Sequence, residues 1–176
     1  MAAFSEIDWH RLDAWAIIAG GGLATLREGQ RQQCHAWLAS NGYDIVSLDC
    51  RAGIDDAVRQ LANLLDWEAQ FGYPLSLNSR NLDALRDGFT FQVVKDRGCV
   101  FEFLGADTAW REDSRWLLGL LSIAAEHSRE HLALGDRFFS LLIVPDDSPL
   151  IGVVVEEIRV PAPFGVGTRA PFTFGS

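Results

Sequence analysis

Short apolar runs alternate with amphipathic stretches along most of the chain. The apolar runs of strand length, rich in β-branched and aromatic residues, predict strands at 23–26, 43–50, 99–104 and 138–144. The stretches with apolar residues at helical spacing predict helices at 28–40, 54–65 and 113–132. Strands that alternate with helices favour an α/β fold built on a small, mostly parallel sheet.

Two runs carry too few polar residues to lie on the surface. The run at 138–144 is continuously apolar, which predicts a strand buried on both faces. The stretch at 113–132 is apolar almost all round, which predicts a buried helix. A further strand is expected at 151–155, antiparallel to the strand at 138–144, because the link between them is too short for a crossover.

A loop and a short helix interrupt this alternation. Residues 71–80 contain Gly, Pro, Asn and Ser without a usable period, which predicts an ordered loop. Asn81 is a favourable N-cap for a helix over 82–87, in which Leu82 and Leu85 would face the core.

Length and composition indicate one globular domain. The chain has 176 residues, of which 48% are hydrophobic and 22% charged, the values of an ordinary water-soluble domain. No apolar run is long enough to span a bilayer, so we expect no membrane segment. The first residues lack the basic start and apolar core of a secretory leader, and we therefore expect a cytoplasmic protein.

The charge balance restricts the partners. With 24 acidic and 15 basic residues, the formal net charge is -9. An acidic surface repels nucleic acid and attracts basic proteins, so we expect a protein partner and no direct contact with nucleic acid. The cysteines Cys34, Cys50 and Cys99 lack the spacing of a disulfide framework or of a metal site, and we expect buried free thiols.

One motif is typical of an enzyme. His127, Glu130 and His131 fit the H-x-x-E-H zinc pattern, for which only Glu156 and Glu157 follow as plausible third ligands. The alternative is the solvated end of a long helix, which we favour because so short a pattern recurs by chance. No nucleophile elbow or phosphate-binding loop occurs, so we expect no catalytic residues, metal or cofactor; a zinc hydrolase is the weakest alternative.

An acidic pair marks the short helix. Asp83 and Asp87 are four residues apart, so both carboxylates would project from one helical face. Like charges at this spacing destabilise a helix by about 0.2–0.5 kcal/mol, and Arg80 and Arg86 are near enough in sequence to pair with them locally. A solvated helix face is the ordinary interpretation of such a pair.

The surrounding sequence resembles a known family of inhibitors. Residues 73–87 are similar to the loop and second helix of the barstar family, which inhibits secreted ribonucleases, and residues 81–87 match its Asn-Leu-Asp-Ala-Leu-x-Asp core. The order of predicted elements over 43–145 also fits this family. The resemblance implies a barstar-like core at 43–145 within one domain. Residues 1–42 and 146–176 lie outside it; the elements predicted there make an N-terminal β-α extension and a C-terminal extension that adds a strand.

The resemblance also implies a function. In this family the loop and second helix block a nuclease active site, and their carboxylates take the place of RNA phosphates. The chain would then be a ribonuclease inhibitor, or an immunity protein against a nuclease toxin, and would need no cofactor. The implied partner-binding residues are Asp83, Asp87, Leu77, Asn78, Ser79, Arg80, Asn81 and Arg86.

The chain departs from the family pattern just before and within this helix. The family usually has aromatic residues and a glycine where this chain has Leu77, Asn78 and Ser79. Arg86 replaces an aromatic residue that often stands between the two acids. These departures favour an alternative, a barstar-fold interaction module whose partner is not a nuclease.

Overall fold

A parallel sheet forms the centre of the molecule. The computed structural model describes residues 3, 4, 8, 11–76, 81–91, 93, 94, 97–155 and 158–161. The sheet has four strands in the order β1-β4-β3-β2, and each neighbouring pair is parallel. The strands are β1 (Leu23–Leu26), β2 (Tyr43–Asp49), β3 (Gly98–Leu104) and β4 (Arg137–Ile143). The α/β fold expected from the sequence is confirmed.

Helices connect the strands. They are α1 (Leu12–Ala14), the π-helix η2 (Trp15–Ala19), the 3-10 helix η3 (Glu28–Gln30), α2 (Arg31–Ser40), α3 (Ile54–Leu64), α4 (Trp67–Phe71), α5 (Asn81–Gly88), α6 (Ala106–Glu112) and α7 (Ser114–Leu134). The short helices α4 and α6 were not expected from the sequence. In the part of the chain that the structure describes, no helix combines the length and apolarity needed to cross a membrane.

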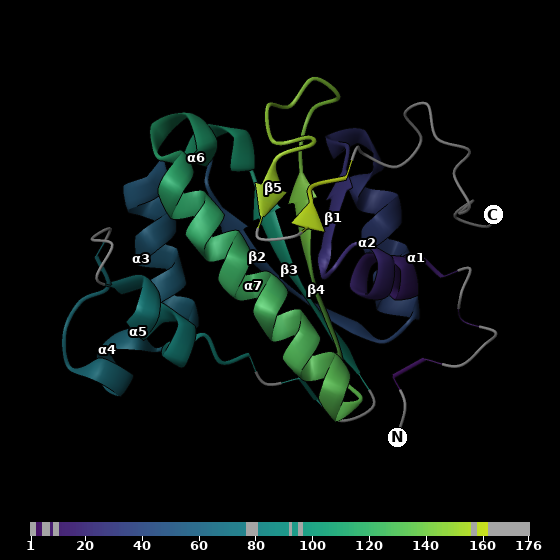
Figure 1. Ribbon diagram of the computed structural model, residues 1–176, viewed down its shortest axis with the longest axis horizontal. Coiled ribbons are helices and arrows are strands. Elements are labelled where there is room, and N and C mark those ends of the chain that lie inside the picture. The colour runs from purple at the N-terminus through teal and green to yellow at the C-terminus, as the bar shows by residue number, and fades with distance from the viewer. Residues whose placement is uncertain are drawn as a thin grey trace.

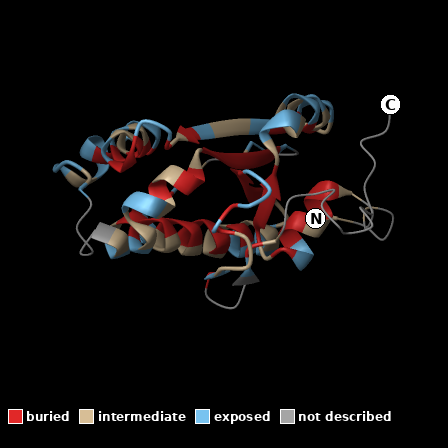
Figure 2. Ribbon diagram, turned by 90° about the horizontal axis from the view of Figure 1, so that it is seen from above, coloured by how far each residue is buried: buried red, intermediate tan, exposed pale blue. Residues whose placement is uncertain are grey.

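The two faces of the sheet are covered by different helices. Figure 1 shows α3, α5, α6 and α7 on one side of the sheet and α1 and α2 on the other. On the side of α7, called the α7 face, the fully buried sheet residues include Leu23, Leu48, Phe101, Phe103, Phe138 and Leu142. On the side of α2, called the α2 face, they include Ala24, Leu26, Val100, Phe139 and Leu141. Figure 2 shows the buried residues gathered on the inner strands and on α7, with exposed residues toward the outside.

The inner strands and the long helix agree with the sequence pattern. β3 is buried along its whole length, and in β4 only Arg137 is partly exposed. The helix α7 runs along this sheet and is capped by Asp113, whose side chain accepts hydrogen bonds from two backbone N–H groups of the first turn. Gly135, with a φ of 89°, ends the helix in the left-handed conformation.

The N-terminal segment completes the sheet. β1 lies beside β4 at one edge, and α2 then carries the chain across the α2 face to β2 at the opposite edge. Residues from α1, η2 and α2 bury the apolar side chains of this face. The described part of residues 1–42 therefore supplies both an edge strand and a cover for one face of the sheet.

The strand expected at 151–155 pairs differently. The prediction that it lies antiparallel to 138–144 is wrong, because β4 has β1 on one side and β3 on the other and offers no free edge. Instead β5 (Val154–Val155) forms a separate antiparallel pair with β6 (Ile158–Arg159). Leu150 and Val155 of this segment still belong to the core on the α7 face.

Candidate functional site

The short acidic helix α5 is anchored on the α7 face. Leu85 is only 2% exposed and lies in the core, and the fully buried Phe89 follows the end of the helix. Leu82 lies against α7, where a Cβ at Gly119 would approach the Leu82 side chain to 2.8 Å. The two leucines therefore face inward, as their spacing predicts, and a glycine on α7 allows the close approach.

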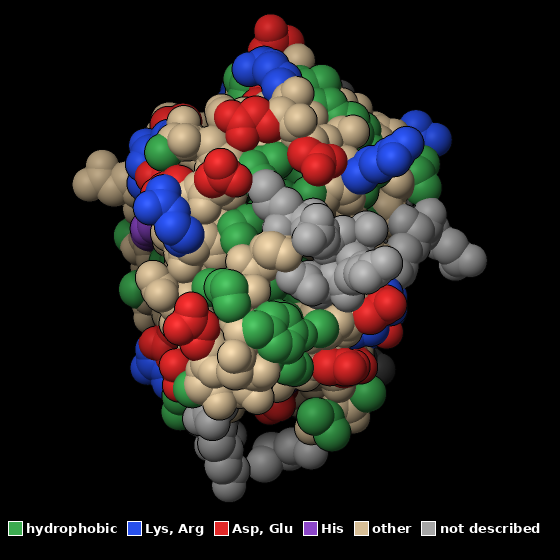
Figure 3. All heavy atoms as spheres, turned by 90° about the vertical axis from the view of Figure 1, so that its left-hand side faces the viewer, with side chains coloured by type: hydrophobic (Ala, Val, Ile, Leu, Met, Phe, Trp, Pro, Cys, Tyr) green, Lys and Arg blue, Asp and Glu red, His purple; other side chains and the backbone are tan. Residues whose placement is uncertain are grey.

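The opposite side of α5 carries the acidic pair. Asp83 and Asp87 are both exposed. Within the described residues, neither carboxylate takes part in an ion pair. Figure 3 views the side of the molecule on which α3, α4 and α5 lie, where acidic and basic side chains are interspersed among neutral and hydrophobic ones. The geometry leaves both aspartates open to a partner.

Arg86 does not pair with the aspartates. Its Nε donates a hydrogen bond to Oε2 of Glu126 on α7, at 2.6 Å. Of the local partners that the sequence offers, Arg86 takes neither aspartate, because α7 runs alongside and presents a carboxylate within reach. The ion pair neutralises Glu126 and leaves Asp83 and Asp87 uncompensated by Arg86.

The other expected contact residues cannot all be placed. Leu77, Asn78, Ser79 and Arg80 lie outside the described residues. Asn81 is the first residue of α5, and its side chain also lies outside the description. The candidate surface that the structure describes consists of Asp83, Arg86 and Asp87.

The histidines of the zinc-like motif pack against aromatic rings. The ring centroid of His127 lies 5.1 Å from that of Phe89, and His131 lies 5.5 Å from Phe138. His127 pairs with Glu130 at 3.3 Å, while His131 pairs with Asp136 at 3.4 Å. The described residues contain no group of three side chains able to hold a metal; Glu156 and Glu157 lie outside them.

A buried carboxylate on the α2 face was missed by the sequence analysis. The side chain of Glu102 in β3 is fully buried. Arg31 on α2 donates to both of its oxygens at 3.0 and 2.9 Å. His35 Nε2 lies 2.6 Å from Oε1, and the Ser47 hydroxyl donates to Oε2 at 2.8 Å. The cluster joins α2 to two strands of the sheet.

The surroundings of Glu102 determine its charge. Burial alone would raise the pKa of this carboxyl, since it disfavours the charged form. The hydrogen bonds from Arg31, His35 and Ser47 outweigh burial, and the pKa is held below its ordinary value. The carboxylate is therefore charged at neutral pH and serves as an acceptor, which makes it an anchor for α2 rather than a proton donor.

A second buried carboxylate lies on the same face. Asp13 is fully buried and accepts hydrogen bonds from Arg11 and from the Tyr43 hydroxyl. Burial and the nearby Asp13 carboxylate raise the pKa of Tyr43, so its phenol remains a donor. This pair fastens the N-terminal helices to the start of β2.

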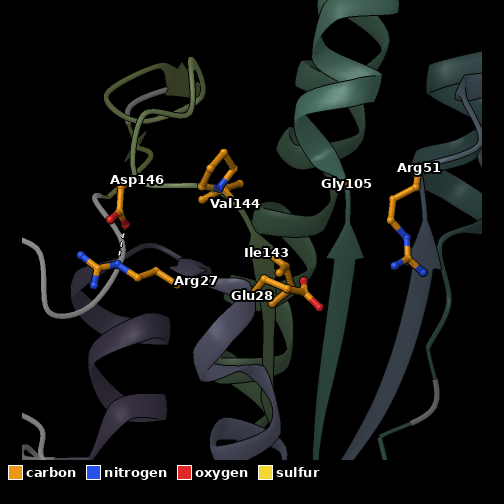
Figure 4. Close-up of a pocket in the computed structure, with 8 residues that line it drawn as sticks. Arg27, Glu28, Arg51, Gly105, Ile143, Val144 and Asp146 are labelled. Atoms are coloured by element: carbon orange, nitrogen blue, oxygen red, sulfur yellow. Dashed lines mark ion pairs between the residues drawn. The ribbon is translucent and has the colours of Figure 1, made fainter.

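An open pocket lies at the carboxyl ends of the strands. It has a volume of about 530 Å³ and is lined by Arg27, Glu28, Arg51, Gly105, Ile143, Val144, Pro145 and Asp146. Figure 4 shows the ion pair between Arg27 and Asp146 at one side and Glu28 pointing toward Arg51 at the other. None of the lining residues belongs to α5, so the pocket is separate from the acidic helix.

Weak sequence signals mark the buried cluster and the pocket. Glu102 is the single charged residue in an otherwise apolar strand, and Arg31 and His35 are four residues apart on one helical face. Residues that follow parallel strands meet at one edge of the sheet, which brings the pocket residues together. The pairing partners themselves follow only from the three-dimensional structure.

No protein-family model, curated protein or solved structure matches the chain.

Proposed function

We propose that the chain is an inhibitor of a basic nuclease and that the exposed face of α5 enters the enzyme's active site. The observation that carries this proposal is the pair of exposed aspartates, Asp83 and Asp87, on a helix whose opposite side is fixed in the core by Leu85. Residues 81–87 match the Asn-Leu-Asp-Ala-Leu-x-Asp motif on which the resemblance to the barstar family rests. The order β2, α3, α5, β3, α7 and β4 is also the order that this resemblance implies.

Rigid support for the two carboxylates suits this role. A side chain that binds a preformed site gains most when its own backbone is already ordered before binding. α5 is held by Leu85, by the contact of Leu82 with Gly119 and by the ion pair between Arg86 and Glu126. The two carboxylates are thus presented on an ordered helix and can accept hydrogen bonds from arginine, lysine or histidine groups that otherwise hold phosphates.

The overall charge favours a basic enzyme as the partner. The net charge of -9 attracts a cationic protein over a distance of several ångströms and increases the rate of encounter. Salt screens this attraction, so the association rate with a basic nuclease is expected to fall as ionic strength rises. An association rate that does not change with salt would argue against this part of the proposal.

The test is inhibition of RNA cleavage by small basic ribonucleases, including any that is encoded next to this chain. The wild-type protein is expected to block cleavage in proportion to its concentration. Asp83→Asn and Asp87→Asn keep the shape of the side chain but remove the charge, and each is expected to raise the concentration for half inhibition by at least about tenfold.

Asp55→Asn is the matched control. Asp55 is also an exposed acid in the first turn of a helix, but it lies on α3. Its substitution changes the net charge by the same amount and is expected to leave inhibition nearly unchanged. Equal inhibition by the wild type and both α5 variants would show that α5 is not the inhibitory site, and a wild type that fails to inhibit would leave a non-nuclease partner as the alternative.

A further inference from the structure

At the pocket by the carboxyl ends of the strands, the connections that follow the strands leave toward opposite faces of the sheet. After β1 the chain passes to α2 on one face of the sheet, whereas after β3 it passes to α6 and α7 on the other. In open parallel sheets, ligands bind in the crevice outside the carboxyl ends at such a point of divergence. The volume of about 530 Å³ falls within the roughly 300–1,000 Å³ typical of small-molecule sites.

Opposite charges face each other across this pocket. The carboxylate of Glu28 points toward Arg51 in Figure 4, and within the described residues Glu28 has no ion-pair partner. Arg51 donates from Nε and Nη2 to the carboxylate of Asp49, which orients its guanidinium and leaves Nη1 without a described acceptor. Both side chains are exposed, so a ligand can reach each of them without a rearrangement of the core.

A glycine at the end of β3 makes room for the side chain of Arg51. Gly105 follows β3 with a φ of 67°, and a Cβ there would approach Cγ of Arg51 to 2.5 Å. Glycine at this place allows the stem of Arg51 to cross the end of β3. Ile143, Val144 and Pro145 add apolar atoms to the lining of the pocket.

We propose that this pocket binds a free α-amino acid with an apolar side chain. The ligand carboxylate would bind the guanidinium of Arg51, and its ammonium group would bind the carboxylate of Glu28. The apolar side chain would lie over Ile143, Val144 and Pro145. Arg27 and Asp146 neutralise each other, so Glu28 and the Nη1 edge of Arg51 remain to bind a ligand. A plain anion would be repelled by Glu28 and a plain cation by Arg51, so a zwitterion fits the pocket best.

The experiment measures binding of leucine, isoleucine, valine, methionine and phenylalanine to the full chain by calorimetry. At least one of them is expected to bind, and its N-acetyl derivative and its amide are each expected to bind about tenfold more weakly, because each lacks one of the two charges. Binding by none of the five overturns the proposal. Equal binding of either derivative also overturns it, since the site would then recognise a single charge.

Two variants locate the site. Arg51→Gln and Glu28→Gln are each expected to weaken binding of the same amino acid by about tenfold. The controls are Arg59→Gln and Glu68→Gln, an exposed arginine paired with Asp56 and an exposed acid in the first turn of α4. The controls are expected to bind like the wild type. Wild-type affinity in either pocket variant, with circular dichroism confirming the fold, would place the ligand elsewhere and overturn the proposal.

Discussion

The two faces of the sheet are attached to their helices by different kinds of interaction. The α7 face is dominated by aromatic rings whose centroids lie 4.6–6.5 Å apart, namely Phe89, Phe91, Phe101, Phe103 and Phe138. On the α2 face, two fully buried carboxylates lie among the apolar residues. Asp13 is held by Arg11 and Tyr43, while Glu102 is held by Arg31, His35 and Ser47.

The two kinds of interaction differ in how much they stabilise the fold and in how far they fix the orientation of a helix. Apolar burial stabilises a helix strongly but without a required orientation, because it depends on the area removed from water. Buried ion pairs contribute less net free energy, since desolvation offsets their attraction, but they need a defined geometry. We infer that the aromatic cluster supplies the rigid support beneath α5, whereas Asp13 and Glu102 fix where the N-terminal segment and α2 lie on the sheet.

Removing one ring from the α7 face is expected to have the largest effect. Phe101 is fully buried and contacts Phe89, Phe91 and Phe103, so Phe101→Ala leaves a cavity that its neighbours cannot fill. The free energy of unfolding is expected to fall by about 3–5 kcal/mol in chemical denaturation. Val94→Ala, at a side chain that is 55% exposed, is the control and is expected to change it by less than about 0.5 kcal/mol.

Replacing Arg31 and replacing Glu102 are expected to lower the free energy of unfolding by unequal amounts. Arg31→Met leaves a fully buried carboxylate without its main partner and is expected to cost about 3 kcal/mol. Glu102→Met leaves Arg31, whose side chain is 29% exposed and can be solvated, and replaces the buried charge by an apolar group. Its expected cost is about 1 kcal/mol or less.

The double variant sharpens this comparison. Once Glu102 is replaced, Arg31→Met removes no ion pair and is expected to add little to the loss. Denaturation of the two single variants and the double variant therefore yields a strong coupling between the two sites. Equal losses in both single variants, or losses that simply add, would show that the ion pair between Arg31 and Glu102 does not hold α2 on the sheet.

The sequence pattern predicted the local elements better than their pairing. The apolar periods of 43–50, 99–104 and 138–144 are properties of neighbouring residues, and the strands appear where these periods predict them. The place of β1 beside β4 is not local, since it joins segments more than a hundred residues apart. The wrong pairing predicted for 151–155 has the same cause. β1 already occupies the edge of β4 that β3 leaves free, and the local pattern does not show this.

The candidate site shows the same division. The outward direction of Asp83 and Asp87 follows from the inward spacing of Leu82 and Leu85, so it was predictable from one helix. The partner of Arg86 was not, because Glu126 lies forty residues later on another helix. The Glu102 cluster draws its members from α2, β2 and β3, and no periodicity within one element contains that information.

The smallest effect expected to distinguish the α2 face from the α7 face is a dependence of the free energy of unfolding on pH, which comes from Glu102. The pKa of Glu102 is lowered in the folded chain, because hydrogen bonds from Arg31, His35 and Ser47 outweigh the burial that would raise it. The unfolded chain therefore takes up a proton at a higher pH than the folded chain does. The stabilisation is fully present above the ordinary carboxyl pKa of 4.5 and is lost as the pH falls through the lower folded value.

Unfolding measured along a descending pH series in high salt is expected to show this loss in the wild type and a weaker one in Glu102→Gln. Salt is needed because Asp44 and Asp49 also have lowered pKa values, through hydrogen bonds from Arg97 and Arg51, and contribute in the same direction. Those pairs lie near the surface and are screened, whereas the Glu102 carboxylate is enclosed. An identical pH dependence in Glu102→Gln would assign the acid sensitivity to other carboxylates and remove the α2 face as its source.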